Sequence, residues 1–398
     1  MDNQLPNQEN EYLKKPSLKV LGLGGGGGNA VNRMIESGVR GVEFIVANTD
    51  RQALINSLAP ITLQLGPKTT RGMGAGGDPK IGMRAADESR ADIAAALEGA
   101  DMVFLTAGMG GGSGTGAIAI AAEVARSIGA VTIAVVTTPF TFEGKRRQQN
   151  ASDGLSWLQP HTDTLISIPN DRLLFVAPKD LPMDVAFRLA DDVLRQSVQG
   201  IAELVTQPGM INVDFAHIRH MMQLGGGAFM AIGQGKGTNK AIDAVDQALH
   251  HPLLESVALE DAAGVIVHFT GGEDLTLHEV SDALTHVQNM TGGNIDMVMG
   301  VTNDDMMQDR AQAIMVITGI GAQTLEEAIT NTEKPRERIQ ETSQMAKSAI
   351  PVKEMVSVSA TVQSPQDLGF SVAVDNAPNY ADLDMPAFLR KRARTQES

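Results

Sequence analysis

Residues 108–117 read GMGGGSGTGA, and they lie between an apolar stretch, MVFLT at 102–106, and a second one, AIAIAAEVA at 117–125. The first stretch is typical of a buried strand and the second of a helix. A glycine-rich turn between them lets backbone N–H groups and a helix N-terminus face an anion. The position therefore predicts a phosphate-binding loop. The chain has no Gly-x-x-x-x-Gly-Lys-Ser/Thr sequence, so this site would lack a P-loop lysine.

Two more glycine-rich stretches decide what the loop binds. GLGGGGGNA at 22–30 follows the first predicted strand and alone also fits a flexible hinge or the Gly-x-Gly-x-x-Gly turn of a dinucleotide-binding domain. A pyrophosphate needs one such loop, whereas two loops at one edge of a sheet favour a triphosphate held from two sides. The third stretch, RGMGAGGDP at 71–79, adds amides for the terminal phosphate. Its Asp78 is close enough in sequence to help order a hydrated cation, and Ser113 and Thr115 add hydroxyl donors.

The rest of the ordered pattern predicts an α/β protein. Short β-rich runs such as LKVLGLG at 18–24 and VTIAVVTTPF at 131–140 alternate with helical periods such as 83–99, as in a parallel sheet. The segment 183–206 predicts a long helix with Leu194, Val198, Ile201 and Val205 on one buried stripe. Beyond it, strand and helix patterns predict a smaller α/β domain that ends near residue 321.

Composition excludes several classes of function. A net charge of −15 over 398 residues argues against nucleic-acid binding, which needs a basic face, and one Trp and two Tyr leave few stacking platforms. The absence of cysteine excludes disulfides and thiolate chemistry, which fits a reducing cytoplasm. Apolar runs are too short to span a bilayer, so we expect no direct membrane insertion.

Several motifs together resemble the tubulin/FtsZ family. GGGSGTG at 110–116 is similar to the family signature GGGTGTG, with Ser in place of the first Thr. The further motifs keep the family's order and cover residues 18–321 without a large gap; they read NAVNRM, NTD, TPFTFEGKRR, IPNDRLL, VQGIAELV and NVDFA. LDMPAFLRK at 383–391 resembles the family's tail peptide, which binds membrane tethers and division regulators.

The resemblance implies a GTPase that binds GTP or GDP with Mg²⁺ and polymerises head to tail into a cytokinetic ring at the mid-cell division site. Leu383 to Arg390 would bind the tethers. The implied organisation is a flexible tail at 1–17, a GTP-binding domain at 18–182, a central helix at 183–206, a catalytic interface loop at 207–224, a C-terminal α/β domain at 225–321, a disordered linker at 322–379 and a partner-binding peptide at 380–398.

The resemblance also implies nucleotide-binding residues. Those near the phosphates would be Gly24, Gly25, Gly26, Gly27, Asn48, Ala75, Gly76, Gly77, Gly110, Gly111, Gly112, Ser113, Gly114, Thr115 and Gly116. Glu143 and Arg147 would reach the ribose and phosphate region. Asn170 and Asp191 would bind the guanine edge, since an acid can accept from its N–H and amino donors, and Phe187 would stack on the base. On pattern alone, a solvated i, i+4 ion pair is the preferred interpretation of Glu143 and Arg147, and Phe187 fits core packing equally well.

The stretch NVDFAHIRH at 212–220 is the expected catalytic loop, inserted into the neighbouring subunit's site, with Asn212, Asp214 and His217 as its catalytic residues. The family carries two acids there, and His217 stands in place of the second. A neutral His can accept a proton from water, but it does not replace a carboxylate toward hydrated Mg²⁺. His217 therefore fits a substitute base, slowed or lost hydrolysis, or no functional role. His217 with His220 also suggests a metal site, although no third ligand is nearby in sequence.

Two other functions remain as alternatives. A nucleotide-bound structural filament with weak or no GTP hydrolysis would follow if His217 abolishes turnover. An NAD-dependent dehydrogenase would use the first glycine run, but the sequence shows no catalytic His and acid pair in a substrate domain.

Overall fold

The computed structural model describes residues 16–176, 182–206, 214–223, 227–250, 262–291 and 295–320. The predicted linker at 322–379 and partner-binding peptide at 380–398 lie outside these residues, as do residues 1–15 of the predicted N-terminal tail and Asn212. The strands are β1 (Leu18–Leu23), β2 (Glu43–Asn48), β3 (Ile61–Gln64), β4 (Met102–Gly108), β5 (Val131–Thr138), β6 (Thr164–Pro169), β7 (Gly227–Lys236), β8 (Gly264–Gly271), β9 (Asp296–Asn303) and β10 (Arg310–Ile320). The α-helices are α1 (Gly24–Glu36), α2 (Arg51–Ile55), α3 (Pro79–Glu88), α4 (Arg90–Leu97), α5 (Ser113–Ser127), α6 (Lys145–Leu158), α7 (Asn170–Val176), α8 (Met183–Thr206), α9 (Phe215–Met222), α10 (Lys240–Leu249) and α11 (Leu277–Met290).

The ten strands form one sheet in the order β3-β2-β1-β4-β5-β6-β7-β10-β8-β9. Strands β1 to β6 pair in parallel, whereas β10 pairs antiparallel with both β7 and β8. The predicted α/β class with a mostly parallel sheet is confirmed. Among the described residues, two pairs join β6 to β7, namely Leu165 with Gly227 and Ile166 with Ala228. The predicted domain boundaries stay a prediction, since one sheet runs through both predicted domains.

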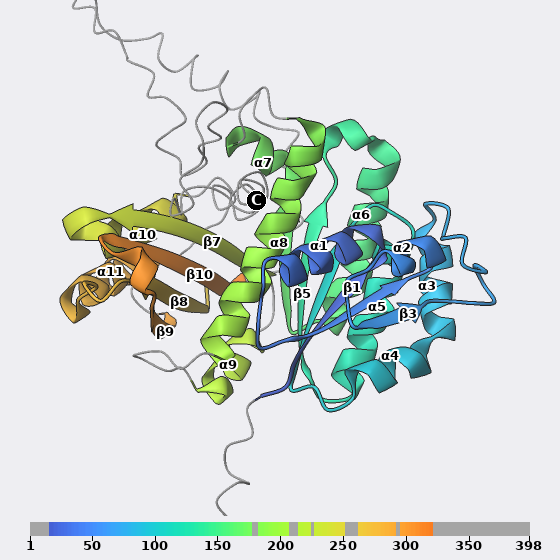
Figure 1. Cartoon of the computed structure of the whole chain (residues 1–398), viewed down its shortest axis with the longest axis horizontal. Coiled ribbons are helices and arrows are strands. Elements are labelled where there is room, and N and C mark those ends of the chain that lie inside the picture. The colour runs from blue at the N-terminus through green and yellow to red at the C-terminus, as the bar shows by residue number, and fades with distance from the viewer. Residues whose placement is uncertain are drawn as a thin grey trace, which may run out of the picture.

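Apolar side chains on the two faces of the sheet belong to separate cores. Along β1, Val20 packs in a core with residues of α1 and α8, while the next residue, Leu21, packs with residues of α4 and α5. This alternation is the two-residue period of a strand covered on both faces. A third core joins β7 to β10 with α10 and α11, and Figure 1 shows these elements together on one side of α8.

Helix α8 packs between the part of the sheet formed by β1 to β6 and the smaller part formed by β7 to β10 (Figure 1). Leu194, Val198 and Ile201 of the predicted stripe are buried, and Val205 is partly buried against the same core. At Gly200 a Cβ atom would lie 2.8 Å from Ile314 Cδ1 of β10, so glycine permits the close approach of helix and strand.

The single helical period expected at 83–99 is wrong in detail, because the structure has two helices, α3 and α4, separated at Ser89. The Ser89 hydroxyl accepts a hydrogen bond from the backbone N–H of Gly66, 3.1 Å away. Serine side chains that bond backbone groups compete with the helix ladder. This hydrogen bond ties the break to the chain that leads into the third glycine-rich stretch.

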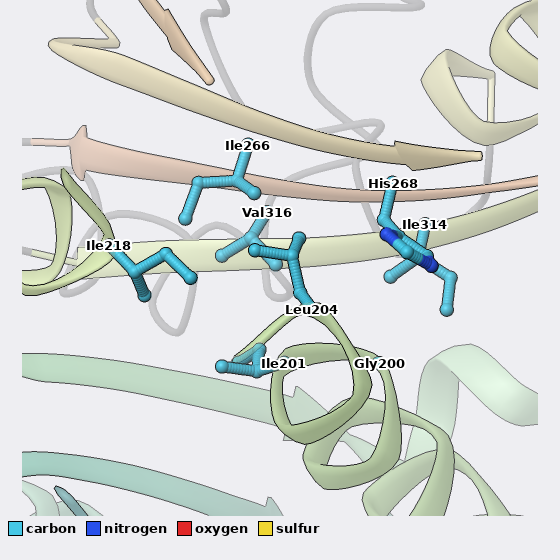
Figure 2. A pocket seen from close by; sticks show the side chains of 8 residues that line it. All are labelled: Gly200, Ile201, Leu204, Ile218, Ile266, His268, Ile314 and Val316. Carbon is cyan, nitrogen blue, oxygen red and sulfur yellow. The ribbon is translucent and has the colours of Figure 1, made fainter. Parts of the chain in front are cut away.

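A buried histidine lies where α8 meets the smaller part of the sheet. His268 of β8 is almost fully buried, and neither ring nitrogen has a hydrogen-bond partner among the described residues. Figure 2 shows its ring among the apolar residues that line this pocket, which are Ile201 and Leu204 of α8, Ile218 of α9, Ile266 of β8, and Ile314 and Val316 of β10. Burial lowers the pKa of His268 to about 4.

Because His268 is buried without a charged partner in the part of the chain that the structure describes, we expect the free energy of unfolding to depend on pH. The unfolded chain takes up a proton near pH 6.5 and the folded chain only near pH 4, so the unfolded state gains protons first as the pH falls. Between pH 7 and pH 5 we expect the free energy of unfolding to fall by about 2 kcal/mol from this group alone. Urea unfolding at both pH values measures the loss. His268→Leu should remove this part of it, and an equal loss in both proteins would contradict the prediction.

Across the described ranges, no helix combines the length and apolar character that a membrane crossing requires.

Candidate nucleotide site

Backbones of the three glycine-rich stretches meet at the carboxyl edge of the parallel strands. A Cβ atom at Gly24 would lie 2.6 Å from the Gly114 nitrogen, and one at Gly26 would lie 2.9 Å from the Gly108 nitrogen. A Cβ atom at Gly112 would lie 2.9 Å from the Asp78 nitrogen. Real Cβ contacts are not this short, so these glycines let the loops after β1 and β4 pack on each other and on the 71–79 loop. The structure brings together the loops that the sequence nominated.

Other glycines of the same loops face open space. A Cβ atom at Gly25, Gly76, Gly77 or Gly111 would meet nothing within 4 Å. The first turns of α1 and α5 begin in these loops, and neither helix has a side-chain hydrogen bond at its N-cap. The N–H groups of a helix's first turn lack partners within the helix and attract anions. Uncapped helix ends beside open glycine backbone can hold a chain of phosphates.

The two hydroxyls of residues 110–116, which we call the signature loop, make hydrogen bonds within the protein. Thr115 is fully buried, and its Oγ1 accepts a hydrogen bond from the Gly110 nitrogen at 2.8 Å. The Ser113 hydroxyl shares a hydrogen bond with the Thr49 hydroxyl. Thr115 thus stabilises the loop's shape, and Ser113 connects it to the segment after β2.

Asn48 lies at the end of β2 and supports the third glycine loop. It is buried, and its Oδ1 accepts from the backbone nitrogen of Asp50 at 3.1 Å. The carbonyl of the next residue, Thr49, accepts from Gly74 at 3.2 Å, which fixes the loop that carries Ala75, Gly76 and Gly77. The Asn48 side chain thus shapes the turn from which Thr49 holds this loop, and contact between Asn48 and the nucleotide stays a prediction.

Asn150 of α6 is a residue that sequence reasoning missed. Its side-chain nitrogen lies 3.2 Å from the Gly77 carbonyl and 3.1 Å from the Gly110 carbonyl, and it donates to both. This one amide ties the 71–79 loop to the signature loop. A polar residue on a helix that bonds distant backbone carbonyls leaves no local pattern in the sequence.

Glu143 and Arg147 form the expected ion pair at the start of α6. The side chain of Glu143 is only 8% exposed and accepts from the backbone nitrogen of Phe140 at 2.8 Å, whereas Arg147 is 54% exposed. The solvated-pair interpretation therefore fits Arg147 and fails for Glu143. Arg147 also lies against the signature loop, because a Cβ atom at Gly110 would lie 2.8 Å from its carbonyl oxygen.

Three residues nominated for the base come from α7 and α8. Asn170 is buried, and its Oδ1 has no hydrogen-bond partner among the described residues. Phe187 is 37% exposed and packs edge-to-face on Phe140, with ring centroids 5.4 Å apart, so core packing does not fully account for it. Asp191 pairs with Arg33 of α1, and burial raises the pKa of Asp191 to about 6. An unpaired amide oxygen, a half-exposed ring and a carboxylate can together hold a planar base.

The catalytic candidates lie elsewhere. Asp214 is the N-cap of α9, with Oδ1 accepting from the Ala216 nitrogen at 3.0 Å, and Asp214, His217 and His220 are all exposed. Helix α9 leads into β7, which runs parallel to β6, so α9 lies at the amino edge of the sheet. From Asp191 to the last residue of α8 the helix rises about 22 Å, and Figure 1 shows α7 and α9 at opposite ends of α8.

No metal site joins the two histidines of this helix to a third ligand within the described ranges, since no three His, Cys, Asp or Glu side chains there are grouped to hold an ion.

The open glycines allow a test of where the ligand binds. Gly25 is the second residue of α1, and a Cβ atom there meets no protein atom. We expect Gly25→Ala to leave the free energy of unfolding of the nucleotide-free protein unchanged or to raise it slightly, because alanine favours the helical conformation more than glycine does. GDP affinity should fall about tenfold or more, because the added methyl blocks the approach of phosphate to the backbone.

Calorimetric titration with GDP and urea unfolding measure these two effects. Gly26→Ala is the matched control, since its Cβ would clash with the Gly108 nitrogen and should destabilise the nucleotide-free protein. Wild-type GDP affinity in Gly25→Ala would place the phosphates elsewhere.

Comparison with known proteins identifies the family of the chain. Residues 17–178 match the tubulin/FtsZ family GTPase domain and residues 226–321 the FtsZ family C-terminal domain. The chain is 45% identical to the cell division protein FtsZ of Pseudomonas aeruginosa, over 94% of this chain and 96% of the relative. It resembles a solved FtsZ dimer from M. jannaschii with a TM-score of 0.73 and 43% identity, over 77% of this chain and 89% of that one.

A more distant solved structure shares the fold alone. It is CetZ2 from Haloferax volcanii, with a TM-score of 0.68 and 20% identity over 82% of this chain and 99% of that one. The two domain matches and the identity to the Pseudomonas protein over nearly the whole chain are far more specific than a shared fold. The chain belongs to the tubulin/FtsZ family, in its FtsZ branch, and carries that family's GTPase domain.

Proposed function

We propose that this chain hydrolyses GTP at the junction between two successive copies, with the nucleotide held by one copy and Asp214 supplied by the next. The observation that carries the proposal is the placement of the two parts. The glycine loops lie at the carboxyl edge of the parallel strands, and α9 lies at the amino edge with Asp214 exposed. Within one chain Asp214 therefore lies far from the glycine loops, whereas head-to-tail stacking joins the two edges. Such a contact does not close, so it builds a filament.

The family supplies the class of function. The chain is a GTP-binding, polymerising cell-division GTPase of the FtsZ branch. We infer that it works in the cytoplasm at the division site, where its filaments form or support a cytokinetic ring.

The phosphates would lie over the open backbone at Gly25, Gly76, Gly77 and Gly111 and meet the first turns of α1 and α5. Asn150 holds two of these loops at a fixed separation. The guanine would lie against Phe187, with Asn170 and Asp191 at its polar edge. The buried Glu143 is held by the Phe140 nitrogen and would face the ribose.

Mg²⁺ fits the donors that this edge offers. Mg²⁺ in nucleotide sites is bound by phosphates, water and one or two carboxylates. One carboxylate at this edge belongs to Asp78, the N-cap of α3, whose backbone abuts the signature loop at Gly112. When bound, the ion would neutralise charge that develops on the phosphates during transfer. Asp78 would orient water around it.

Asp214 would act on the attacking water. An acceptor held at the start of α9 can orient a water molecule and take a proton from it. His217 lies one turn further on the same exposed side, at the third position of α9. If His217 serves as a base or is silent, the chain is an active GTPase. If His217 marks the loss of a needed acid, the chain forms a structural filament with little hydrolysis.

The proposal predicts that turnover depends on assembly. GTP hydrolysis per subunit should be near zero in dilute protein and rise steeply above the concentration at which filaments sediment. A rate per subunit that stays constant through that threshold would show that each copy works alone.

A separate prediction concerns residues 380–398, which we propose to bind membrane tethers and division regulators through Leu383 to Arg390. Deletion of these residues should leave GTP binding and assembly unchanged and abolish capture of tether proteins in a pull-down. Phe388→Ser together with Leu389→Ser, which keeps the chain length, should reproduce the loss. Undiminished capture by the deleted protein would remove this role.

A further inference from the structure

Arg33 connects the phosphate end of the site to the base end. It lies in the last turn of α1, whose first turn begins the glycine loop at Gly24. Arg33 Nε donates to Asp191 Oδ2 at 2.8 Å, and the two side chains are 26% and 15% exposed. The pair therefore joins α1 to α8 in a partly buried place, nine residues or about 14 Å along α1 from the loop.

The charge of Asp191 depends on this contact. Burial favours the neutral acid, Arg33 favours the carboxylate, and Asp192 next to it favours the neutral acid again. These are the charged groups that act on Asp191 from α1 and from α8 itself. The carboxylate of Asp192 accepts hydrogen bonds from Arg195 and Gln196, so its oxygens are engaged within α8 rather than with Arg33. Arg33 is the group that opposes the effect of burial.

Guanine recognition requires the charged form. The base presents N–H donors on the edge that an acid binds, and a carboxylate has about four acceptor positions on its two oxygens. Arg33 occupies one position on Oδ2, which leaves Oδ1 and the remaining position for the base. A neutral acid would instead present an O–H group toward the donors.

We propose that Arg33 is a positioning residue for guanine recognition, which holds the Asp191 carboxylate ionised and oriented toward the base. The inference rests on the proposed role of Asp191. It assigns to α1 a second task, because the helix that begins at the phosphates also fixes the group that selects the base.

The test is the pH profile of GDP affinity for the full chain, measured by calorimetry between pH 5 and pH 8.5. We expect Arg33→Gln to raise the midpoint of the profile by about one pH unit, the lower end of what an opposite charge contributes. At pH 6 the affinity should then be about fivefold below wild type, with little difference at pH 8.5. The phosphate of GDP also titrates near pH 6, but it does so equally for every variant.

Two further variants make the result specific. Arg33→Lys keeps a positive charge and should stay near the wild-type profile, and Arg40→Gln removes an exposed arginine just beyond α1 as the matched control. An unmoved midpoint in Arg33→Gln, or a loss of equal size at every pH, would overturn the inference. Asp191→Asn separates the two ideas: unchanged GDP affinity there would refute the base assignment itself, whereas weakened binding with an unmoved Arg33→Gln profile would refute only the role of Arg33.

Discussion

Asp214→Asn should reduce GTP turnover by about 10² to 10⁴-fold, the usual contribution of a positioned acid or base. The variant isolates the charge, because asparagine is as good an N-cap as aspartate and should preserve the hydrogen bond to the Ala216 nitrogen that starts α9. Alanine would lose both. Phosphate release is measured above the assembly threshold, with sedimentation to show that the filament mass is unchanged. Wild-type turnover in Asp214→Asn would show that this carboxylate is not part of the reaction.

A mixing experiment then tests whether Asp214 acts across the junction. Asp214→Asn keeps an intact nucleotide site, and Gly25→Ala keeps an intact α9. In a mixed filament, a Gly25→Ala copy can supply Asp214 to the nucleotide of an Asp214→Asn copy. At a GTP concentration that fills the Asp214→Asn site but leaves the Gly25→Ala site largely empty, the mixture should therefore hydrolyse GTP faster than either protein alone at the same total concentration. A rate equal to the average of the two would mean that the loop and the site work within one chain.

His217→Asp should raise turnover at least about tenfold, part of what a positioned acid or base contributes. The change restores the second acid of the family at a site that accepts it. His217 is exposed and occupies the third position of α9, where a negative charge is stabilised by the helix dipole. A second carboxylate there can help order water or a hydrated Mg²⁺, which an imidazole does poorly. Steady-state phosphate release at saturating GTP measures the gain.

The controls separate the interpretations of His217. His220→Asp adds the same charge one turn further along the same helix and should leave turnover unchanged. His217→Asn removes the imidazole without adding charge, so a clear loss in this variant would show that His217 already serves as a base. No change in either His217 variant would make the residue silent. Robust wild-type turnover that collapses in Asp214→Asn would exclude the structural filament with little hydrolysis.

Much of the fold was predictable because its signals are local. Runs such as VTIAVVTTPF carry the continuous apolar character of strands covered on both faces, and the period of 183–206 fixes the buried face of α8. The break at Ser89 was not predictable in this way, because it depends on a hydrogen bond from Gly66, 23 residues earlier. The edge strand β3 was also missed, since its alternation of apolar and polar residues extends over only four positions, Ile61–Gln64, none of them fully buried.

The same difference between local signals and long-range contacts applies to the residues of the candidate site. The glycine loops were visible because close backbone approach restricts a position to glycine, and that restriction is written in the sequence itself. Asn150 and Arg33 were not, because their partners are the Gly77 and Gly110 carbonyls and the Asp191 carboxylate, far away along the chain. Thr115 was nominated as a phosphate donor, which stays a prediction, but the sequence did not reveal that its hydroxyl also accepts a hydrogen bond from the Gly110 nitrogen. Residue type alone does not reveal which partner a hydroxyl has.

In the proposed head-to-tail filament, the position of α9 at the opposite edge of the sheet from the glycine loops makes the two ends unequal. A row of n copies has only n − 1 completed junctions, so one terminal copy holds a nucleotide that no neighbour can attack. At the other end, the last copy presents a bare Asp214 with no nucleotide to act on. The first end keeps its triphosphate and can exchange it with solution, while interior nucleotides are sealed and consumed. Growth and loss of subunits should therefore proceed at different rates at the two ends, although all subunits are identical.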